Sequence, residues 1–95
     1  MSTLDQIATK IIKEQELVIG PLAWSEAGKV KGLRIVNTDS GEVQISDGDE
    51  KQVIDRLVAQ YERLFGRASH EVCREAVANM IAQLPPAEVP LSLRS

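Results

Sequence analysis

Residues 49–84, DEKQVIDRLVAQYERLFGRASHEVCREAVANMIAQL, carry apolar side chains at the spacing of two amphipathic helices on either side of Gly66. Residues three and four apart lie on one face of an α-helix, so each set forms a stripe that needs a partner surface. Asp47 or Asp49 can cap the first helix and Ser69 the second. Because the link is short, we expect an antiparallel pair that forms one wall of the core. The stripes consist of Val53, Ile54, Leu57, Val58, Tyr61, Leu64 and Phe65, and of Val72, Cys73, Ala76, Val77, Met80, Ile81 and Leu84.

Two further helices are predicted in the first thirty residues. Apolar side chains recur at helical spacing over residues 4–18, which indicates a helix over about residues 2–16. Gly20 and Pro21 end this helix. Proline is tolerated at the first position of a helix, so a second, shorter helix is expected over residues 21–30.

Residues 32–46 alternate apolar and polar side chains on either side of a turn near residues 38–41, which is typical of a β-hairpin. An isolated two-stranded hairpin is only marginally stable in water. It must therefore lie on the helices, or pair with the hairpin of another copy through an exposed edge. The apolar members are Leu33, Ile35, Val43 and Ile45.

These elements predict an α+β fold with four helices. A two-stranded antiparallel β-hairpin lies between the second and third helices, and the last two helices form a C-terminal antiparallel helical hairpin. Residues 1–86 are expected to form a single small α+β domain. Residues 87–95 are expected to form an extended C-terminal tail, either frayed or docked on a neighbour. A chain of 95 residues can bury a core without disulfides or metals.

The composition argues against several classes of function. The chain has 11 basic and 14 acidic residues and a net charge of -3, so bulk electrostatics do not favour DNA or RNA as a partner. No apolar run approaches the roughly 18 residues of a membrane span, so no membrane partner is expected. One cysteine cannot form an internal disulfide, and no cluster has the spacing of a zinc site. We therefore expect a cytoplasmic protein with no metal or cofactor.

Three residues are candidates for an interface. Ile11 and Val18 share a heptad position on the first helix, which predicts a surface for a second copy. Alternatively, this helix packs on the helical hairpin of its own chain. Trp24 is the only tryptophan, and its ring either anchors a partner or lies in the core at a helix junction. These residues predict a homodimer, with a different protein as the alternative partner.

Two groups of side chains are candidates for ligand chemistry. His70 and Cys73 are three residues apart on one helical face, where an imidazole can promote formation of a thiolate. The alternative for Cys73 is a small core residue. Lys29, Lys31 and Arg34 form the one compact basic group, which either contacts an anion or is solvated surface.

The segment Ala68-Ser69-His70-Glu71 resembles the start of the phosphoacceptor box of sensor histidine kinases, in which a His-Glu pair opens a helical stretch. The resemblance implies that His70 is the phosphorylated residue. The sequence then departs from the box, because residues 73–75 are Cys-Arg-Glu instead of an arginine-threonine or arginine-asparagine pair followed by proline. No nucleotide-binding segment follows.

No catalytic constellation stands out, and the chain has more apolar elements than one thin sheet can cover. Both observations predict a small, non-enzymatic interaction or regulatory module that self-associates. The alternative is a small-molecule-binding domain or minor enzyme with a pocket between the hairpin and the helices. Its polar edge would then come from His70, Cys73 or the basic group of residues 29–34.

Overall fold

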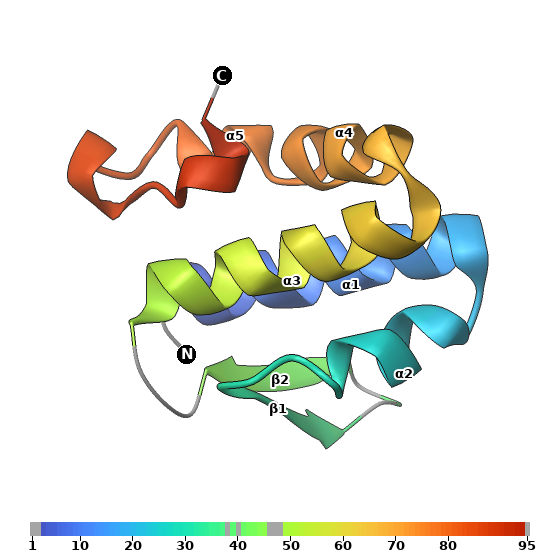
Figure 1. Cartoon of the computed structure of the whole chain (residues 1–95). Coiled ribbons are helices and arrows are strands. Elements are labelled where there is room, and N and C mark those ends of the chain that lie inside the picture. The colour runs from blue at the N-terminus through green and yellow to red at the C-terminus, as the bar shows by residue number, and fades with distance from the viewer. Residues whose placement is uncertain (1–2, 38, 40, 46–48, 95) are drawn as a thin grey trace.

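A computed structural model describes residues 3–37, 39, 41–45 and 49–94, and it confirms the predicted α+β class (Figure 1). The two-stranded antiparallel hairpin lies between the second and third helices, as expected. In chain order the elements are α1 (Thr3–Ile19), α2 (Leu22–Ala27), β1 (Leu33–Asn37), β2 (Glu42–Ile45), α3 (Glu50–Phe65), α4 (Arg67–Ala76), α5 (Ala78–Ile81) and the 3-10 helices η1 (Pro86–Glu88) and η2 (Leu91–Leu93).

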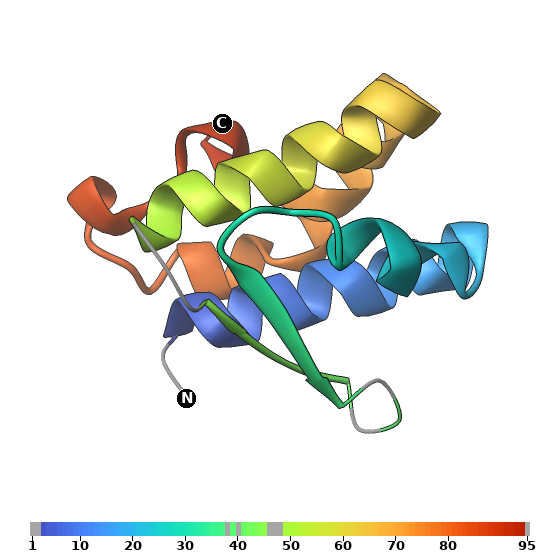
Figure 2. The same ribbon diagram turned by 60° about the horizontal axis from the view of Figure 1, so that its bottom comes forward.

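The helices and the hairpin pack in layers around one core. α1 and α3 lie side by side, and α4 packs against both of them while running in the opposite direction to α3 (Figures 1 and 2). The hairpin and α2 cover α1 from the other side, with β2 against α1 (Figure 2). The core between these layers consists mainly of Ile7, Ala8, Ile11, Ile12, Ala23, Trp24, Ala27, Val43, Val53, Ile54, Leu57, Val58, Tyr61, Cys73 and Val77.

The central helix α3 forms as its sequence predicts. Asp49 is its N-cap, and the Asp49 carboxylate accepts a hydrogen bond from the backbone N–H of Lys51 at 2.9 Å. Asp47, the alternative cap, lies outside the described residues. At the other end Gly66 has a φ of 88°, a conformation that glycine adopts without a steric penalty. Between these two residues Val53, Ile54, Leu57, Val58 and Tyr61 are buried, whereas Leu64 of the predicted stripe is 46% exposed.

The second helix of the C-terminal hairpin differs from the prediction at both ends. α4 begins at Arg67, directly after Gly66, because the Gly66 carbonyl already accepts a hydrogen bond from the Ser69 N–H at 3.1 Å. Ser69 therefore lies inside the first turn, buried, and is not the cap. The helix is also interrupted at Val77, whose φ of -115° and ψ of 10° leave the helical region. Valine is a poor helix former, and Val77 remains fully buried where the chain changes direction into α5.

The N-terminal helices have different bounds from those predicted. α1 continues to Ile19, and it ends where the Gly20 N–H donates to the Glu16 carbonyl at 2.8 Å. α2 ends at Ala27 rather than at residue 30, because tight turns follow it at once. In one of these turns the Val30 N–H donates to the Ala27 carbonyl at 3.1 Å.

The hairpin is attached to α1, mainly through β2. Leu33 pairs with Ile45 and Ile35 with Val43, and an irregularity follows Ile35. The Ile45 N–H donates to the Asp5 carboxylate of α1 at 3.1 Å, which covers part of the β2 edge. Of the expected turn, residues 38 and 40 lie outside the described residues.

The segment after α5 is not the extended tail that the sequence predicts. It forms the 3-10 helices η1 and η2, and η2 packs against α3 and α4 (Figure 1). The cause is burial: Val89, Pro90 and Leu93 are removed from solvent by the helices of the same chain. We call residues 86–94 the C-terminal strap.

Among the described residues, no helix has the combination of length and apolar character that crossing a membrane requires.

Candidate functional site

The three candidate interface residues have different environments. Ile11 is fully buried in the core of the monomer, so a partner cannot touch it in this conformation, and the prediction of an Ile11 interface is wrong for the folded monomer. Trp24 is 8% exposed, and its indole N–H donates to the Glu16 carboxylate at 2.8 Å. The core alternative therefore holds for Trp24. Val18 is 62% exposed and remains available to a partner.

Leu17, beside Val18, is 80% exposed, which makes it the most exposed large apolar residue among those described. The two side chains border a hollow of about 490 Å³ between α1 and α4. We call this hollow the α1–α4 groove. Its lining combines apolar side chains with charges of both signs and consists of Lys10, Glu14, Leu17, Val18, Val72, Glu75, Ala76 and Asn79.

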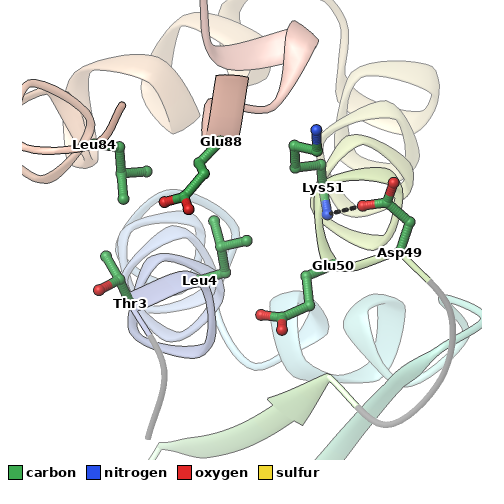
Figure 3. A pocket seen from close by; sticks show the side chains of 7 residues that line it. All are labelled: Thr3, Leu4, Asp49, Glu50, Lys51, Leu84 and Glu88. Carbon is green, nitrogen blue, oxygen red and sulfur yellow. Dashed lines mark hydrogen bonds between the residues drawn. The ribbon is translucent and has the colours of Figure 1, made fainter. Parts of the chain in front are cut away.

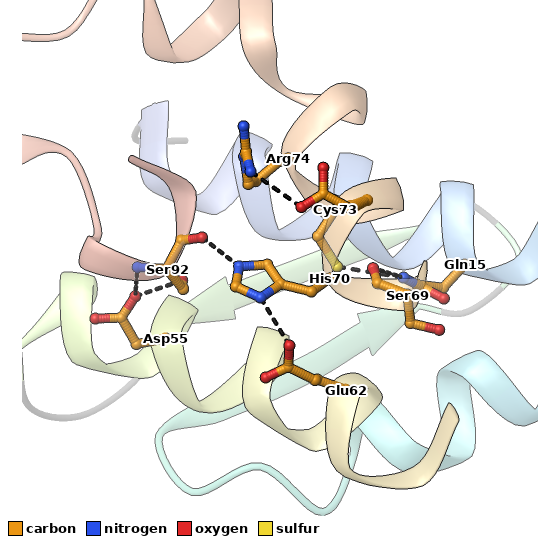
Figure 4. A network of polar contacts seen from close by, with 9 residues as sticks. Gln15, Asp55, Glu62, Ser69, His70, Cys73, Arg74 and Ser92 are labelled. Carbon is orange, nitrogen blue, oxygen red and sulfur yellow. Dashed lines mark hydrogen bonds and ion pairs between the residues drawn. The ribbon is translucent and has the colours of Figure 1, made fainter. Parts of the chain in front are cut away.

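His70 is the centre of a polar network that ties α3, α4 and the strap together (Figure 4). Its Nδ1 lies 2.9 Å from Glu62 Oε2 of α3, and its Nε2 lies 2.6 Å from the Ser92 carbonyl of η2. The backbone N–H and hydroxyl of Ser92 both donate to Asp55 Oδ1, at 2.9 and 2.5 Å. The hydrogen bond to the Ser92 carbonyl, assisted by Glu62, raises the pKa of His70.

Cys73 belongs to a different, buried cluster on the side of α4 that faces α1. The Gln15 side-chain amide of α1 donates to the Ser69 carbonyl at 2.9 Å and to Cys73 Sγ at 3.2 Å (Figure 4). Gln15 is fully buried, and its Oε1 has no hydrogen-bond partner among the described residues. Burial raises the pKa of the Cys73 thiol to about 11.

The predicted pairing of His70 with Cys73 is therefore not observed. Each side chain has other partners, and at neutral pH a thiol with a pKa of about 11 is protonated and a poor nucleophile. Both ring nitrogens of His70 are also occupied, so a phosphoryl donor reaches neither nitrogen unless the strap moves.

The compact basic group is also rearranged. Lys29 and Lys31 line a hollow of about 300 Å³ together with Arg56 and Arg63 of α3, whereas Arg34 is exposed on β1 and does not line it. α3 thus supplies the two arginines that sequence proximity does not reveal.

A further hollow of about 430 Å³ lies where the N-termini of α1 and α3 meet η1 (Figure 3). Leu4 and Leu84 form its apolar part, and Asp49, Glu50 and Glu88 supply carboxylates around it. No group of three or more histidine, cysteine or acidic side chains among the described residues is arranged to hold a metal ion.

Sequence reasoning missed Asp55, Glu62, Ser92 and Gln15. A usable signal existed for one of them: Glu62 and His70 are each four residues from Gly66, so an antiparallel hairpin that turns at Gly66 places them opposite each other. Ser92 carries no such signal, because its position depends on the return of the strap.

The fold and these contacts define a small α+β domain whose C-terminal strap is held by a polar network. Comparisons of the chain with protein-family models, with curated proteins and with solved structures found no match.

Proposed function

We propose that this chain is a small interaction module of the cytoplasm that self-associates through the C-terminal end of α1. One observation carries the proposal: Leu17 and Val18 are 80% and 62% exposed on a helix whose other apolar residues are buried or partly buried. Two adjacent exposed apolar side chains beside a groove of mixed apolar and charged lining are typical of a surface that binds another protein.

A second copy of the same chain is the occupant that fits best. Leu17 and Val18 are exposed at the α1–α4 groove, whose lining also includes Val72 and Ala76. In a two-fold dimer each copy inserts its exposed residues against the groove of the other, because both copies carry the same two features. Lys10 and Glu75 on the rim give the two-fold partner unlike charges to face.

A non-enzymatic role is supported by the state of the candidate nucleophile. Cys73 is buried, its thiol is protonated at neutral pH, and its hydrogen-bond partner is an amide instead of a base. The chain has one cysteine, which cannot form an internal disulfide, and this is compatible with a reducing compartment such as the cytoplasm.

The test is the mass in solution over a dilution series, measured by light scattering coupled to size exclusion. We expect a dimer for the wild type and a monomer for Val18→Asp, because a buried carboxylate without a partner strongly disfavours the interface. Val36→Asp is the matched control, since Val36 is also an exposed valine but lies on β1. Circular dichroism of each variant verifies that it is folded.

A wild type that remains monomeric at every concentration refutes the proposal. A dimer that persists in Val18→Asp and dissociates in Val36→Asp shows instead that the hairpin edges form the interface.

A further inference from the structure

We propose that the groove between the α2–β1 segment and α3 binds a small molecule that carries two or more phosphate groups. This hollow, the basic groove, is lined by seven residues: Lys29, Val30, Lys31, Arg56, Ala59, Gln60 and Arg63. Four of the seven are cationic and none is acidic. The proposal is independent of self-association, because no residue lines both the basic groove and the α1–α4 groove.

The positive charge of the basic groove is largely uncompensated. Lys29 is paired with Glu26 at 3.0 Å. Among the described residues, Lys31, Arg56 and Arg63 have no carboxylate within ion-pairing distance. A chain of net charge -3 therefore gathers on one small surface three cations that have no ion pair among the described residues, of which Arg63 is close enough to Glu26 to help lower the pKa of the Glu26 carboxyl group. Like charges repel, so such a cluster favours a bound anion.

Contacts with neutral groups hold the two arginines in place. Arg56 Nη1 donates to the Lys31 carbonyl at 3.2 Å, which ties the α2–β1 segment to α3, and Figure 2 shows this segment running along α3. Arg63 Nη2 donates to Gln60 Oε1 at 2.8 Å. The Gln60 amide in turn donates to Glu26 at 2.8 Å. A guanidinium has five N–H donors, so both arginines keep donors for a ligand while their side chains are already ordered.

Glu26 orients two of the residues that line the basic groove, Lys29 and Gln60. It is nearly buried on α2, and hydrogen bonds from Lys29 and then Gln60 lower the pKa of its carboxyl group. Glu26 therefore remains charged and keeps Lys29 and Gln60 oriented, whereas the cations further along the groove face solvent.

The spacing of Arg56 and Arg63 favours a ligand with two phosphate groups. Arg56 and Arg63 are seven residues apart, which is about two turns and about 10 Å along one side of α3. About 10 Å is the separation of the two residues along the helix axis, and a ligand with two phosphate groups lets each guanidinium bind a phosphate of its own. Two phosphate groups carry about three to four negative charges at neutral pH, which matches the unpaired cations. The arginine fork also suits phosphate oxygens, which accept two parallel hydrogen bonds from one guanidinium.

The size of the basic groove favours a small molecule over a nucleic acid. A volume of about 300 Å³ is at the lower end of the range for small-molecule sites. A nucleic acid requires an extended basic surface, and the net charge of -3 repels its long backbone.

Isothermal titration calorimetry with inorganic pyrophosphate and tripolyphosphate tests the proposal on the full chain at physiological ionic strength. We expect both probes to bind at least about tenfold more tightly than monophosphate. Lys31→Gln and Arg63→Gln should each weaken binding by about tenfold or more, which corresponds to the loss of one charge-assisted contact. Arg34→Gln is the matched control, because it removes the same charge from the neighbouring strand without touching the groove.

Three results overturn the proposal. The first is no heat of binding for either probe at millimolar concentration. The second is equal weakening by Arg34→Gln and Arg63→Gln, which indicates a diffuse field instead of a site. The third is citrate binding as tightly as tripolyphosphate, which indicates a site for carboxylates. Circular dichroism melting curves for each variant separate a loss of binding from a loss of fold.

Discussion

Protonation of His70 should fasten the C-terminal strap, because both of its ring nitrogens face acceptors. Nδ1 faces the Glu62 carboxylate at 2.9 Å, and Nε2 faces the Ser92 carbonyl at 2.6 Å. A neutral imidazole has one N–H and satisfies one of these oxygens, whereas the imidazolium has two and satisfies both. The structure therefore predicts that the folded state binds a proton at His70 more tightly than the unfolded chain does.

The direction in which stability changes with pH follows from this difference in proton binding between the folded and unfolded chain. The pKa of His70 is raised in the folded protein, chiefly by the hydrogen bond to Ser92, with Glu62 and Glu71 adding in the same direction against partial burial. Its contribution to stability is thus complete below the unfolded pKa of about 6.5 and is lost as the pH rises through the folded pKa.

Solvent exposure limits the free energy that the contacts of protonated His70 contribute to stability. A buried hydrogen bond to a charged group contributes about 1.5–3 kcal/mol. Here the side chains of His70 and Glu62 are 26% and 43% exposed, so we expect about 1 kcal/mol after screening. For a domain of this size, that amounts to a change in melting temperature of about 4–8 °C.

Two measurements check the prediction. His70 is the only histidine, so its imidazole proton resonances give its pKa by NMR without an assignment problem. We expect a value above about 6.5 in the wild type and a lower value in Glu62→Gln. The melting temperature of the wild type minus that of His70→Gln, taken over the same pH series, should be largest at acid pH and shrink as the pH rises.

A substitution at a residue that does not contact His70 provides a second test of its raised pKa. Asp55 does not contact His70, but it holds Ser92 through two hydrogen bonds. Asp55→Ala should therefore lower the pKa of His70 by releasing the strap. The reasoning is refuted if His70 titrates at or below about 6.5, or if the difference from His70→Gln is the same at every pH.

Three other predictions concern stability and reactivity. Tyr61→Phe removes the hydroxyl that donates to the Ala23 carbonyl at 2.7 Å, and urea unfolding should show a loss of about 0.5–1.5 kcal/mol; an unchanged midpoint contradicts this. Gly66→Ala should cost about 1–3 kcal/mol, because the φ of 88° with an extended ψ is accessible almost only to glycine. The matched control Gly28→Ala, at a helical φ of -64°, should be neutral or stabilising in the same melting assay. Native Cys73 should react with a thiol reagent at pH 8 only as fast as the protein opens, and rapid labelling of the folded chain is the opposing result.

The sequence predicts those parts of the fold that depend on local periodicity and caps. The cap at Asp49, the end at Gly66 and the apolar positions from Val53 to Tyr61 follow from residue spacing and backbone preference and are confirmed, whereas Leu64 of the predicted stripe is exposed. The break at Val77 and the return of the strap depend instead on which distant surfaces remain uncovered. A periodic pattern within seven or eight residues of sequence does not show which distant surfaces remain uncovered.

The candidate site was predicted only in part, for the same reason. His70 stands out in the sequence because no other histidine exists, but its nearest sequence neighbour of chemical interest, Cys73, is not its partner. The contacts of His70 come from eight residues before it and twenty-two residues after it. Likewise, Lys29 and Lys31 were grouped with Arg34 by proximity, whereas the groove groups them with α3.

The polar side of α3 explains why apolar periodicity alone was insufficient. Asp55 and Glu62 are seven residues apart and form an acidic row, which meets the strap and His70. Arg56 and Arg63 have the same spacing and form a basic row, one position further around the helix, which meets the α2–β1 segment. Residues seven apart lie almost in line on a helix, so each row presents charges of one sign along one side of α3 over about two turns. A central helix such as α3 is covered on several sides. The charge pattern of its polar residues therefore reflects the elements that pack against it, as its apolar stripe does.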